Sequence, residues 1–361
     1  MKNLIILVFL LNGILMQSQE KKLKWYKGNT HTHTVLSGHA DTHPDTVALW
    51  YLERNYNFLI LSEHNQFIDP QSINLPKDRR KDFILIPGEE VSDYKHIHTT
   101  GMNVSREVFP QYPNELSTVK NNRFENFKIY LMQKHTDSIR SANGIPILNH
   151  PNWNSGASAA DIQKVEGLNM IELYNGHPDV NNWGNEKHAS MEKKWDSLLT
   201  AGRKIYGVSS DDAHFFKNWA VDESNPGRGW VMVQSNELSP NAITDAMVNG
   251  NFYASSGVIL KKIIKTEKYY KIKIDTDRSL EELKSPLLVG FKTAKEAEGF
   301  SIEFISDGGK VIQRSKGNSA KVKIPKGVKY VRAKIIYSRG LSTNSEQFFA
   351  WTQPIFLNNI K

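Results

Sequence analysis

The chain has 361 residues, of which 39% are hydrophobic and 23% are charged, and it contains no cysteine. Its 8 Trp, 13 Tyr and 16 Phe supply ample core material, which excludes an intrinsically disordered chain. The lack of cysteine excludes a disulfide framework and a thiolate metal site. At about 100–200 residues per domain, the length predicts two domains.

An apolar run from Leu4 to Met16 follows Lys2 at the start of the chain. A membrane-spanning helix needs about 20 apolar residues, so this run is too short and instead has the size of the hydrophobic part of a signal peptide. We predict a signal peptide over residues 1–19, cleaved near Ser18 to Glu20, and therefore a secreted or periplasmic protein. The alternative is a buried first strand or helix.

Short apolar runs alternate with amphipathic stretches from Trp25 to about Ser235. The strand-like runs are KWYKGNTHTH, NFLILSEH, DFILIPGEE, GIPILNHP, NMIELYN, KIYGVSSDDAH and GWVMVQS. The helix-like stretches are PDTVALWYLERNY, ENFKIYLMQKHTDSIRSAN, SAADIQKVEG and EKHASMEKKWDSLLTAG. Strands that alternate with helices are typical of a parallel sheet, either open or closed into a barrel.

The pattern changes after Gly257, where short alternating segments are separated by turn signals such as DGG and PKG. Helical patterns are nearly absent from this part of the chain. We therefore predict a small antiparallel β-sandwich over residues 258–361, preceded by a first domain over residues 20–257.

The positive charge is concentrated in the second of these parts. Residues 258–361 hold 21 Lys and Arg against 10 Asp and Glu, a net charge of +11, whereas the whole chain has +8. A basic face there could bind an anionic glycan, a lipid headgroup or a nucleic acid. Lysines on solvated strand faces and sheet edges would give the same count. Nucleic acid is the least favoured partner, because basic and aromatic residues do not alternate as in a base-stacking surface.

Side chains that can bind a metal ion follow several of the predicted strands, namely His31, His33, His64, Glu90, His150, Asp212 and His214. The carboxyl ends of parallel strands meet at one edge, so these groups would share a cleft. A lone histidine at a strand end is more often an ordinary polar residue, but a set of this size favours a metal site. Imidazole and carboxylate ligands without thiolate suit catalytic Zn, Mn or Fe.

The order of the motifs HTH, SEH, GEE, HIH, NHP and DDAH resembles the polymerase-and-histidinol-phosphatase (PHP) superfamily of metal-dependent hydrolases. The stretches YKGNTHTHTVLSGH, IPGEEVS and IELYN are similar to its secreted carbaryl-hydrolase-like branch. The resemblance covers residues 23–257. It implies an α/β fold, a distorted seven-stranded β/α barrel, here followed by the antiparallel β-sandwich, and it implies two or three divalent metal ions.

The resemblance also implies the metal ligands. One ion would be held by His31, His33, Glu90 and Asp212, a second by Glu90, His96 and His150, and a third by His39, His64 and His214. The HIH motif offers either His96 or His98 as a ligand, and the spacing to the following TGMN favours His96.

The predicted activity is hydrolysis of a small or polymer-linked phosphoester by a metal-bridging hydroxide. Neighbouring divalent ions lower the pKa of a shared water and neutralise charge on the reacting oxygen. We expect Asp212 or a metal-site histidine such as His39 to transfer the proton. Arg228 could bind a substrate phosphate with its planar guanidinium, or could simply stabilise a turn.

Asn175 and His177, in ELYNGHP, could line the pocket or cap a loop. The remaining candidates His43, His135 and His188 are predicted to be structural or exposed. Two other functions stay open. The same metals could serve a carbamate, carboxyl ester or amide hydrolase, or the chain could be a non-catalytic binding protein with a vestigial metal site.

Overall fold

The structure is a computed structural model that describes residues 22–93, 97–109 and 124–357. The predicted signal peptide lies outside the described residues. Within the part that is described, no helix is long and apolar enough to cross a membrane.

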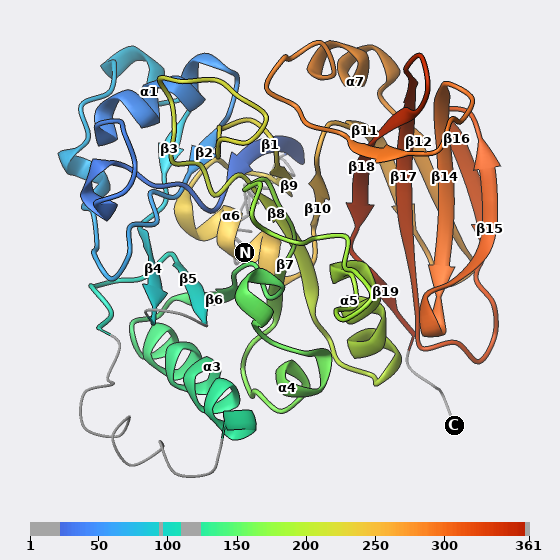
Figure 1. The fold of residues 1–361 in the computed structure, drawn as a ribbon, viewed down its shortest axis with the longest axis horizontal. Helices are drawn as coiled ribbons and strands as arrows, with labels where there is room; N and C mark the ends of the chain where they lie inside the picture. Colours follow the sequence, from blue (N-terminus) through green and yellow to red (C-terminus); the bar gives the residue numbers. More distant parts are fainter. Residues whose placement is uncertain (1–21, 94–96, 110–123, 358–361) are drawn as a thin grey trace, which may run out of the picture.

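The largest sheet is mixed and joins strands from both ends of the chain (Figure 1). Its main path runs β15-β14-β17-β18-β10-β9-β1-β2-β3, with β13 paired to β18 and β19 paired to β17. Its strands are β1 (Lys24–Asn29), β2 (Phe58–Leu59), β3 (Ile84–Leu85), β9 (Trp230–Ser235), β10 (Phe252–Ser255), β13 (Phe291–Thr293), β14 (Gly299–Ser306), β15 (Lys310–Lys316), β17 (Tyr330–Gly340), β18 (Ser345–Thr352) and β19 (Ile355–Phe356).

Two smaller sheets complete the strand architecture. A five-stranded sheet has the order β4-β5-β6-β7-β8 and contains β4 (Gly88–Ser92), β5 (His98–Met102), β6 (Ile145–Leu148), β7 (Met170–Asn175) and β8 (Tyr206–Ser210). A three-stranded antiparallel sheet has the order β11-β12-β16 and contains β11 (Leu260–Lys265), β12 (Tyr269–Ile274) and β16 (Ser319–Lys323).

Four of the described helices, α1, α3, α4 and α5, lie where the amphipathic stretches predicted them, whereas α6 and α7 were not predicted. Helix α3 contacts β5 and β6, α5 contacts β7, and α6 contacts β9. The helices are α1 (Pro44–Glu53), α3 (Phe124–Ser141), α4 (Ala159–Gln163), α5 (Met191–Thr200), α6 (Pro240–Val248) and α7 (Thr276–Glu282). Short 3-10 turns are η1 (Val35–Ser37), η2 (Pro70–Ser72), η3 (Lys77–Arg79), η4 (Trp153–Ser155) and η5 (Asp307–Gly309).

Local sequence explains where several helices begin. Ser158 and Asp161 form a reciprocal capping box at α4, and the Ser190 hydroxyl accepts a hydrogen bond from a backbone N–H at the start of α5. At the start of α1, the His43 ring accepts a hydrogen bond from a backbone N–H, and Pro44 occupies the first helical position. His43 is therefore an exposed helix cap, which agrees with its predicted structural role.

A buried apolar cluster fills the space between the mixed sheet and the five-stranded sheet. Phe58 comes from the mixed sheet, Met102 and Val208 come from the five-stranded sheet, and Ile243 and Met247 come from α6. The cluster is made of closely packed large side chains, so it fixes the positions of the strand ends that surround it.

The predicted fold class is wrong in its distorted seven-stranded β/α barrel, because the strands form large mixed sheets. Strands assigned to one barrel lie in two different sheets. Strand β1 belongs to the mixed sheet, where it pairs antiparallel with β9, whereas β4 belongs to the five-stranded sheet, where it pairs antiparallel with β5. Strand β10 pairs with β18, so the mixed sheet continues from the first part of the chain into the last. The prediction failed because alternating strands and helices suggested only parallel neighbours, whereas several actual neighbours are antiparallel.

Candidate metal centre

The ends of strands from the two sheets are joined at one place. A parallel bridge pairs Thr32 with Ala213, and another pairs His64 with Glu90. Backbone hydrogen bonds of 2.9 Å run from His33 N to Ala213 O and from Asp212 N to His31 O. The segments that follow β1, β2 and β8 are thereby fixed against one another, together with β4, and their polar side chains converge.

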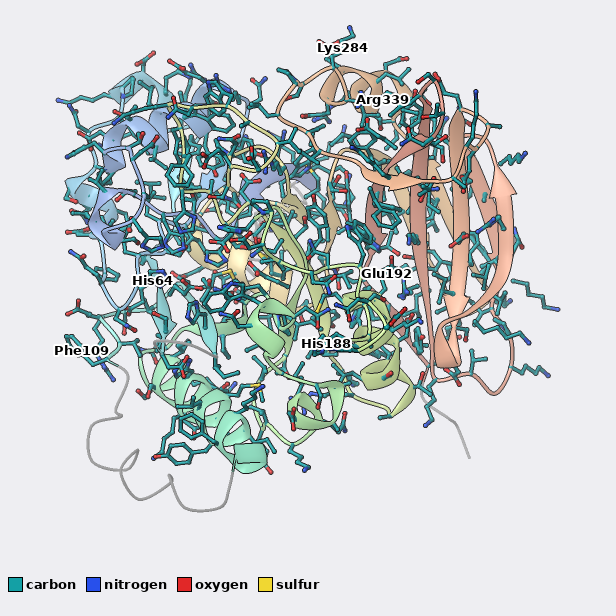
Figure 2. The ribbon with its side chains drawn as sticks, viewed as in Figure 1. His64, Phe109, His188, Glu192, Lys284 and Arg339 are labelled. Carbon is teal, nitrogen blue, oxygen red and sulfur yellow. The ribbon has the colours of Figure 1, made fainter. Side chains whose placement is uncertain are left out.

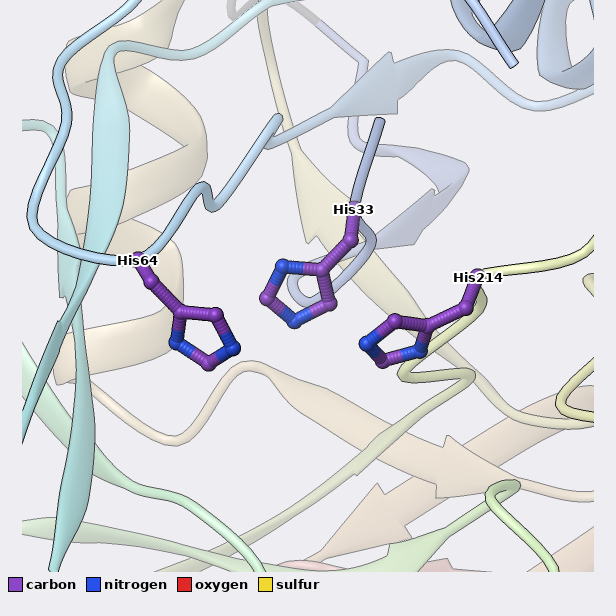
Figure 3. Close-up of side chains that lie close together, drawn as sticks. All are labelled: His33, His64 and His214. Atoms are coloured by element: carbon purple, nitrogen blue, oxygen red, sulfur yellow. The ribbon is translucent and has the colours of Figure 1, made fainter. Parts of the chain in front are cut away.

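The predicted metal-binding side chains gather into one cluster. Four overlapping groups have ligand atoms within 4.8 Å of one another, and they are His33–His64–His214, His31–His150–Asp212, His31–His33–Glu90 and His64–Glu90–His98. Figure 3 shows the first group, in which the rings of His33, His64 and His214 project from separate segments into one space. The His64 ring is also marked in the whole molecule (Figure 2).

The innermost atoms are fully buried and very close together. His31 Nε2 lies 3.1 Å from His33 Nε2, 3.2 Å from Glu90 Oε1 and 3.2 Å from Asp212 Oδ1. His33 Nε2 lies 3.3 Å from the same Asp212 oxygen and 3.5 Å from Glu90 Oε2. His150 Nε2 approaches Glu90 Oε1 to 3.4 Å.

The outer ring nitrogens of His31 and His33 have partners that fix where the protons lie. His31 Nδ1 lies 2.8 Å from the Glu172 carboxylate, which can only accept, so Nδ1 carries the hydrogen. His33 Nδ1 lies 2.9 Å from Ser37 Oγ, whose hydroxyl donates to Glu63 in a short hydrogen bond. In the neutral rings both Nε2 atoms therefore present lone pairs to the centre.

In three further histidines, one ring nitrogen also donates a hydrogen bond and the other is left with a lone pair. His214 Nδ1 donates to the carbonyl of Asp212, and His39 Nδ1 donates to the carbonyl of Ser37. Their Nε2 atoms face each other at 2.8 Å. His98 Nε2 donates to the carbonyl of Asp93, which leaves Nδ1 toward Glu90 Oε1 at 3.3 Å. That Nδ1 is buried and makes no hydrogen bond.

This donor set fits divalent metal ions. Lone pairs of imidazole and carboxylate that face one another at about 3 Å repel unless a positive charge lies between them. Glutamate or aspartate behind a ligating histidine, as Glu172 lies behind His31, is the usual arrangement around protein-bound metals. His31, His33, His64, Glu90, His98, His150, Asp212 and His214 are the described residues that would hold such ions.

The electrostatics of the cluster also favour a bound cation. Burial raises the pKa values of Glu90 and Asp212, but neighbouring histidines, His31 above all, outweigh it and hold both pKa values well below normal. Burial, together with positive neighbours such as His39, lowers the pKa of His214 to about 4. Burial also opposes charge on His31, yet Asp212, Glu90 and Glu172 raise its pKa well above normal. The carboxylates therefore draw positive charge into the centre, as a proton or as a metal ion.

Two of the clustered residues adopt unusual backbone conformations. His150 has φ of 26° and Asp212 has φ of 50°, in the left-handed region that residues with a Cβ rarely occupy. The side chain of Glu172 accepts a 2.7 Å hydrogen bond from the backbone N–H of His150, which helps to hold this conformation. Backbone strain of this kind is found at sites where side-chain position matters more than local stability.

The cluster opens into a pocket of about 210 Å³. Its wall includes Trp153, His177, Asp179 and Val180 in addition to the clustered histidines and carboxylates. Trp153 packs against His98 and His150, with ring centres 5.1 and 5.4 Å apart. A small substrate could therefore contact the cluster from one side.

Most of the predicted site residues come together here, including His39, whose side chain lines the pocket. His96 lies outside the described residues, while its alternative His98 is part of the cluster. Arg228 does not line the pocket, because its guanidinium donates to the carbonyl oxygens of Ala220 and Leu287. It stabilises loops, as the alternative interpretation proposed.

Sequence reasoning missed the residues behind the ligands. Glu172, Glu63 and Asn149 were not singled out, yet Asn149 donates a 2.7 Å hydrogen bond to Glu90 Oε1. Glu63 precedes His64 directly, and Glu172 lies within the buried strand β7. A carboxylate in a strand that is otherwise apolar, as in MIELYN, was the available signal.

No family model matches the chain, and no curated protein matches it. Several solved structures resemble it, among them the following two. One is a two-domain protein from Bacteroides vulgatus containing a predicted PHP-like metal-dependent phosphoesterase, with 14% identity over 93% of this chain and 96% of that chain and a TM-score of 0.45. The other, from Bifidobacterium adolescentis, is a proposed metal-dependent phosphoesterase, with 11% identity over 55% of this chain and 89% of that chain and a TM-score of 0.36.

Proposed function

We propose that this protein is a metal-dependent hydrolase of the PHP type that acts on phosphoesters. The observation that carries the proposal is the convergence of buried imidazole lone pairs on Glu90 and Asp212, with their outer nitrogens held by acceptors such as Glu172. The order of the motifs HTH, SEH, GEE, NHP and DDAH gives independent support, since it resembles that superfamily.

Divalent cations supply Lewis acidity, which activates water and neutralises charge on an ester oxygen. The protein's own side chains fix the positions of the reacting groups. Asn175 donates hydrogen bonds to Glu172 Oε2 and to Asp212 Oδ2, which fixes the Asp212 carboxylate relative to His31. Asp212 would also accept a proton from the nucleophile, a role that differs from the predicted transfer of a proton to the leaving oxygen.

His177 is the residue best suited to donate a hydrogen bond to the leaving oxygen. It lines the pocket, and its Nδ1 accepts a 3.1 Å hydrogen bond from the backbone N–H of Asp179. Its hydrogen is therefore on Nε2, the reverse of the arrangement in His33 and His214. A histidine that offers a donor rather than a lone pair would stabilise negative charge on the leaving oxygen through a hydrogen bond.

Hydrolysis of a carbamate or carboxyl ester is the second candidate. Asp179, Trp153 and Val180 form part of the pocket wall. An acidic group at this wall repels a doubly charged phosphate monoester, whereas it tolerates a diester or an uncharged ester. Among phosphoesters, diesters are therefore the preferred substrates of this proposal.

Metal analysis and a substrate panel test the proposal together. Purified protein is expected to contain Zn, Mn or Fe, and to hydrolyse bis-p-nitrophenyl phosphate faster than p-nitrophenyl phosphate or p-nitrophenyl acetate. His33→Ala should remove metal and activity but leave the circular dichroism nearly intact. His43→Asn, which replaces a histidine cap outside the pocket with another capping side chain, should change neither.

Faster hydrolysis of the acetate or of a carbamate would favour the second candidate. Bound metal without hydrolysis of any substrate would favour a non-catalytic binding protein. A chain that binds no divalent metal would contradict both hydrolase proposals.

A further inference from the structure

The outer face of the three-stranded sheet is unusually basic. Its inner face is apolar and buried, with Tyr270 and Ile272 from β12 and Val322 from β16. Side chains alternate between faces along a strand, so the opposite face receives the intervening residues. Five of these are exposed lysines, which we call the lysine staircase: Lys262, Lys273, Lys271, Lys321 and Lys323.

The strand register places these lysines in one continuous line. Lys262 is directly opposite Lys273, and Lys271 is directly opposite Lys321. Lys271 and Lys273 are two residues apart on β12, as Lys321 and Lys323 are on β16. Successive lysines are therefore about 5 Å apart across strands and about 7 Å apart along them. The staircase crosses the sheet diagonally from β11 to β16.

This arrangement is unfavourable for folding by itself. Like charges directly opposite each other destabilise an antiparallel pair. No carboxylate of the described residues forms an ion pair with any of the five lysines. Protection of sheet edges explains lysines on β11 and β16, but it does not explain Lys271 and Lys273, because β12 is the central strand.

We propose that the lysine staircase binds a linear acidic polysaccharide. A row of positive charges on a flat face is complementary to a chain that carries sulfate or carboxylate groups at regular intervals. The Tyr269 ring lies beside the row, but Lys321 Nζ lies 4.0 Å from its centre, so the ring is already covered. A polysaccharide needs no stacking surface here, whereas a single-stranded nucleic acid would need one.

The test measures binding of dextran sulfate to the full chain, with neutral dextran for comparison. Wild-type protein should bind dextran sulfate at low salt and release it as salt rises, and should ignore neutral dextran. The double variant Lys271→Gln with Lys273→Gln should bind about tenfold more weakly or worse. Its Tm should not fall, because two unfavourable charge pairs are removed.

The matched control is Lys77→Gln with Lys187→Gln, which removes the same charge from exposed positions outside this sheet. Its affinity should stay near that of the wild type. Equal weakening by both double variants would overturn the proposal, since binding would then depend only on net charge. Staircase-dependent binding to vesicles containing phosphatidylserine or to single-stranded DNA, with no binding to dextran sulfate, would overturn it as well.

Discussion

Two buried clusters of charged side chains differ in how their charges are balanced. In the first, around Arg332 on β17, each charged group has an oppositely charged partner within the chain, although Arg332 Nη1 itself makes no hydrogen bond. Arg332 donates two 2.7 Å hydrogen bonds to Asp196 and one of 3.2 Å to Glu192, which also pairs with Lys334. In the second, around Glu90, imidazole nitrogens that carry lone pairs face carboxylate oxygens and one another. Figure 2 labels Glu192 and His64, which mark the two clusters.

This difference shows how a binding site can be distinguished from an ion-pair network that only stabilises the fold. Both clusters join elements that are distant in sequence, and both shift pKa values strongly. Only the cluster around Glu90 directs lone pairs inward from rings whose outer nitrogens are already committed. A network whose charges balance within the chain, here called the complete cluster, stabilises the fold, whereas the incomplete cluster, in which buried acceptors face one another, favours a bound cation.

The largest effect should come from Glu90→Gln in the incomplete cluster. This change replaces one carboxylate oxygen by an NH₂ group and removes the negative charge that His31, His64 and His98 face. Turnover of the best substrate should fall at least about 10³-fold, the size of effect seen when a group that stabilises the transition state is lost. Steady-state kinetics and metal content would measure it.

The adjacent residue Glu89 provides the matched control. Its carboxylate is also buried but accepts a 2.6 Å hydrogen bond from Val108 N, on the other side of β4. Burial raises the pKa of Glu89 to about 7, so Gln is a close substitute for its protonated form. Glu89→Gln should keep metal and activity. A similar loss in both variants would mean that the effect is structural.

The next largest effect should come from breaking the complete cluster with Arg332→Met. This change leaves the Asp196 carboxylate buried without its main partner. Removing one member of a buried ion pair typically costs about 3–5 kcal/mol of unfolding free energy. Urea unfolding would measure the loss, and Lys310→Met, at an exposed lysine, is the control. Metal content per folded molecule should not change, and a loss below about 1 kcal/mol would contradict the comparison.

A smaller effect is expected from Glu172→Gln, because Glu172 lies behind His31 and does not face the centre. Metal affinity should fall about 10–100-fold, as for other residues that orient a metal-binding histidine. Competition with a chelating dye measures the affinity. Activity at saturating metal should change much less than affinity does. Glu166→Gln, at an exposed glutamate, should leave the affinity unchanged.

The smallest effect concerns the pH dependence of stability. Burial raises the pKa of Glu192, but Lys334 and Arg332 outweigh it and lower the pKa to about 2. The folded-state pKa is below the ordinary value, so the stability that Glu192 contributes is present above about pH 4.5 and is lost as the pH falls toward 2. The gap in unfolding free energy between wild type and Glu192→Gln should therefore narrow from pH 5 to pH 2. If the difference in unfolding free energy widened as the pH fell, the lowered pKa of Glu192 would be refuted.

The site was more predictable than the fold. His31, His33 and Asp212 could be named because each follows an apolar run, and strand ends that meet bring such residues together. The spacing favoured His96 over His98, but local sequence could not decide between them, because residues two apart on an extended segment point to the same side. Arg228 was ambiguous because its partners, such as Leu287, are distant in the sequence.

Sequence alone predicted many of the short strands and helices, though not α6, α7 or β5, and it predicted which ligand-type residues end those strands, because both depend on local periodicity. Only the tertiary structure decided that β10 pairs with β18, that β1 pairs with β9, and which acceptor holds each histidine ring. Strand partners and buried hydrogen bonds depend on groups far apart in the chain. Their selection depends on how the whole core packs, which no local pattern encodes.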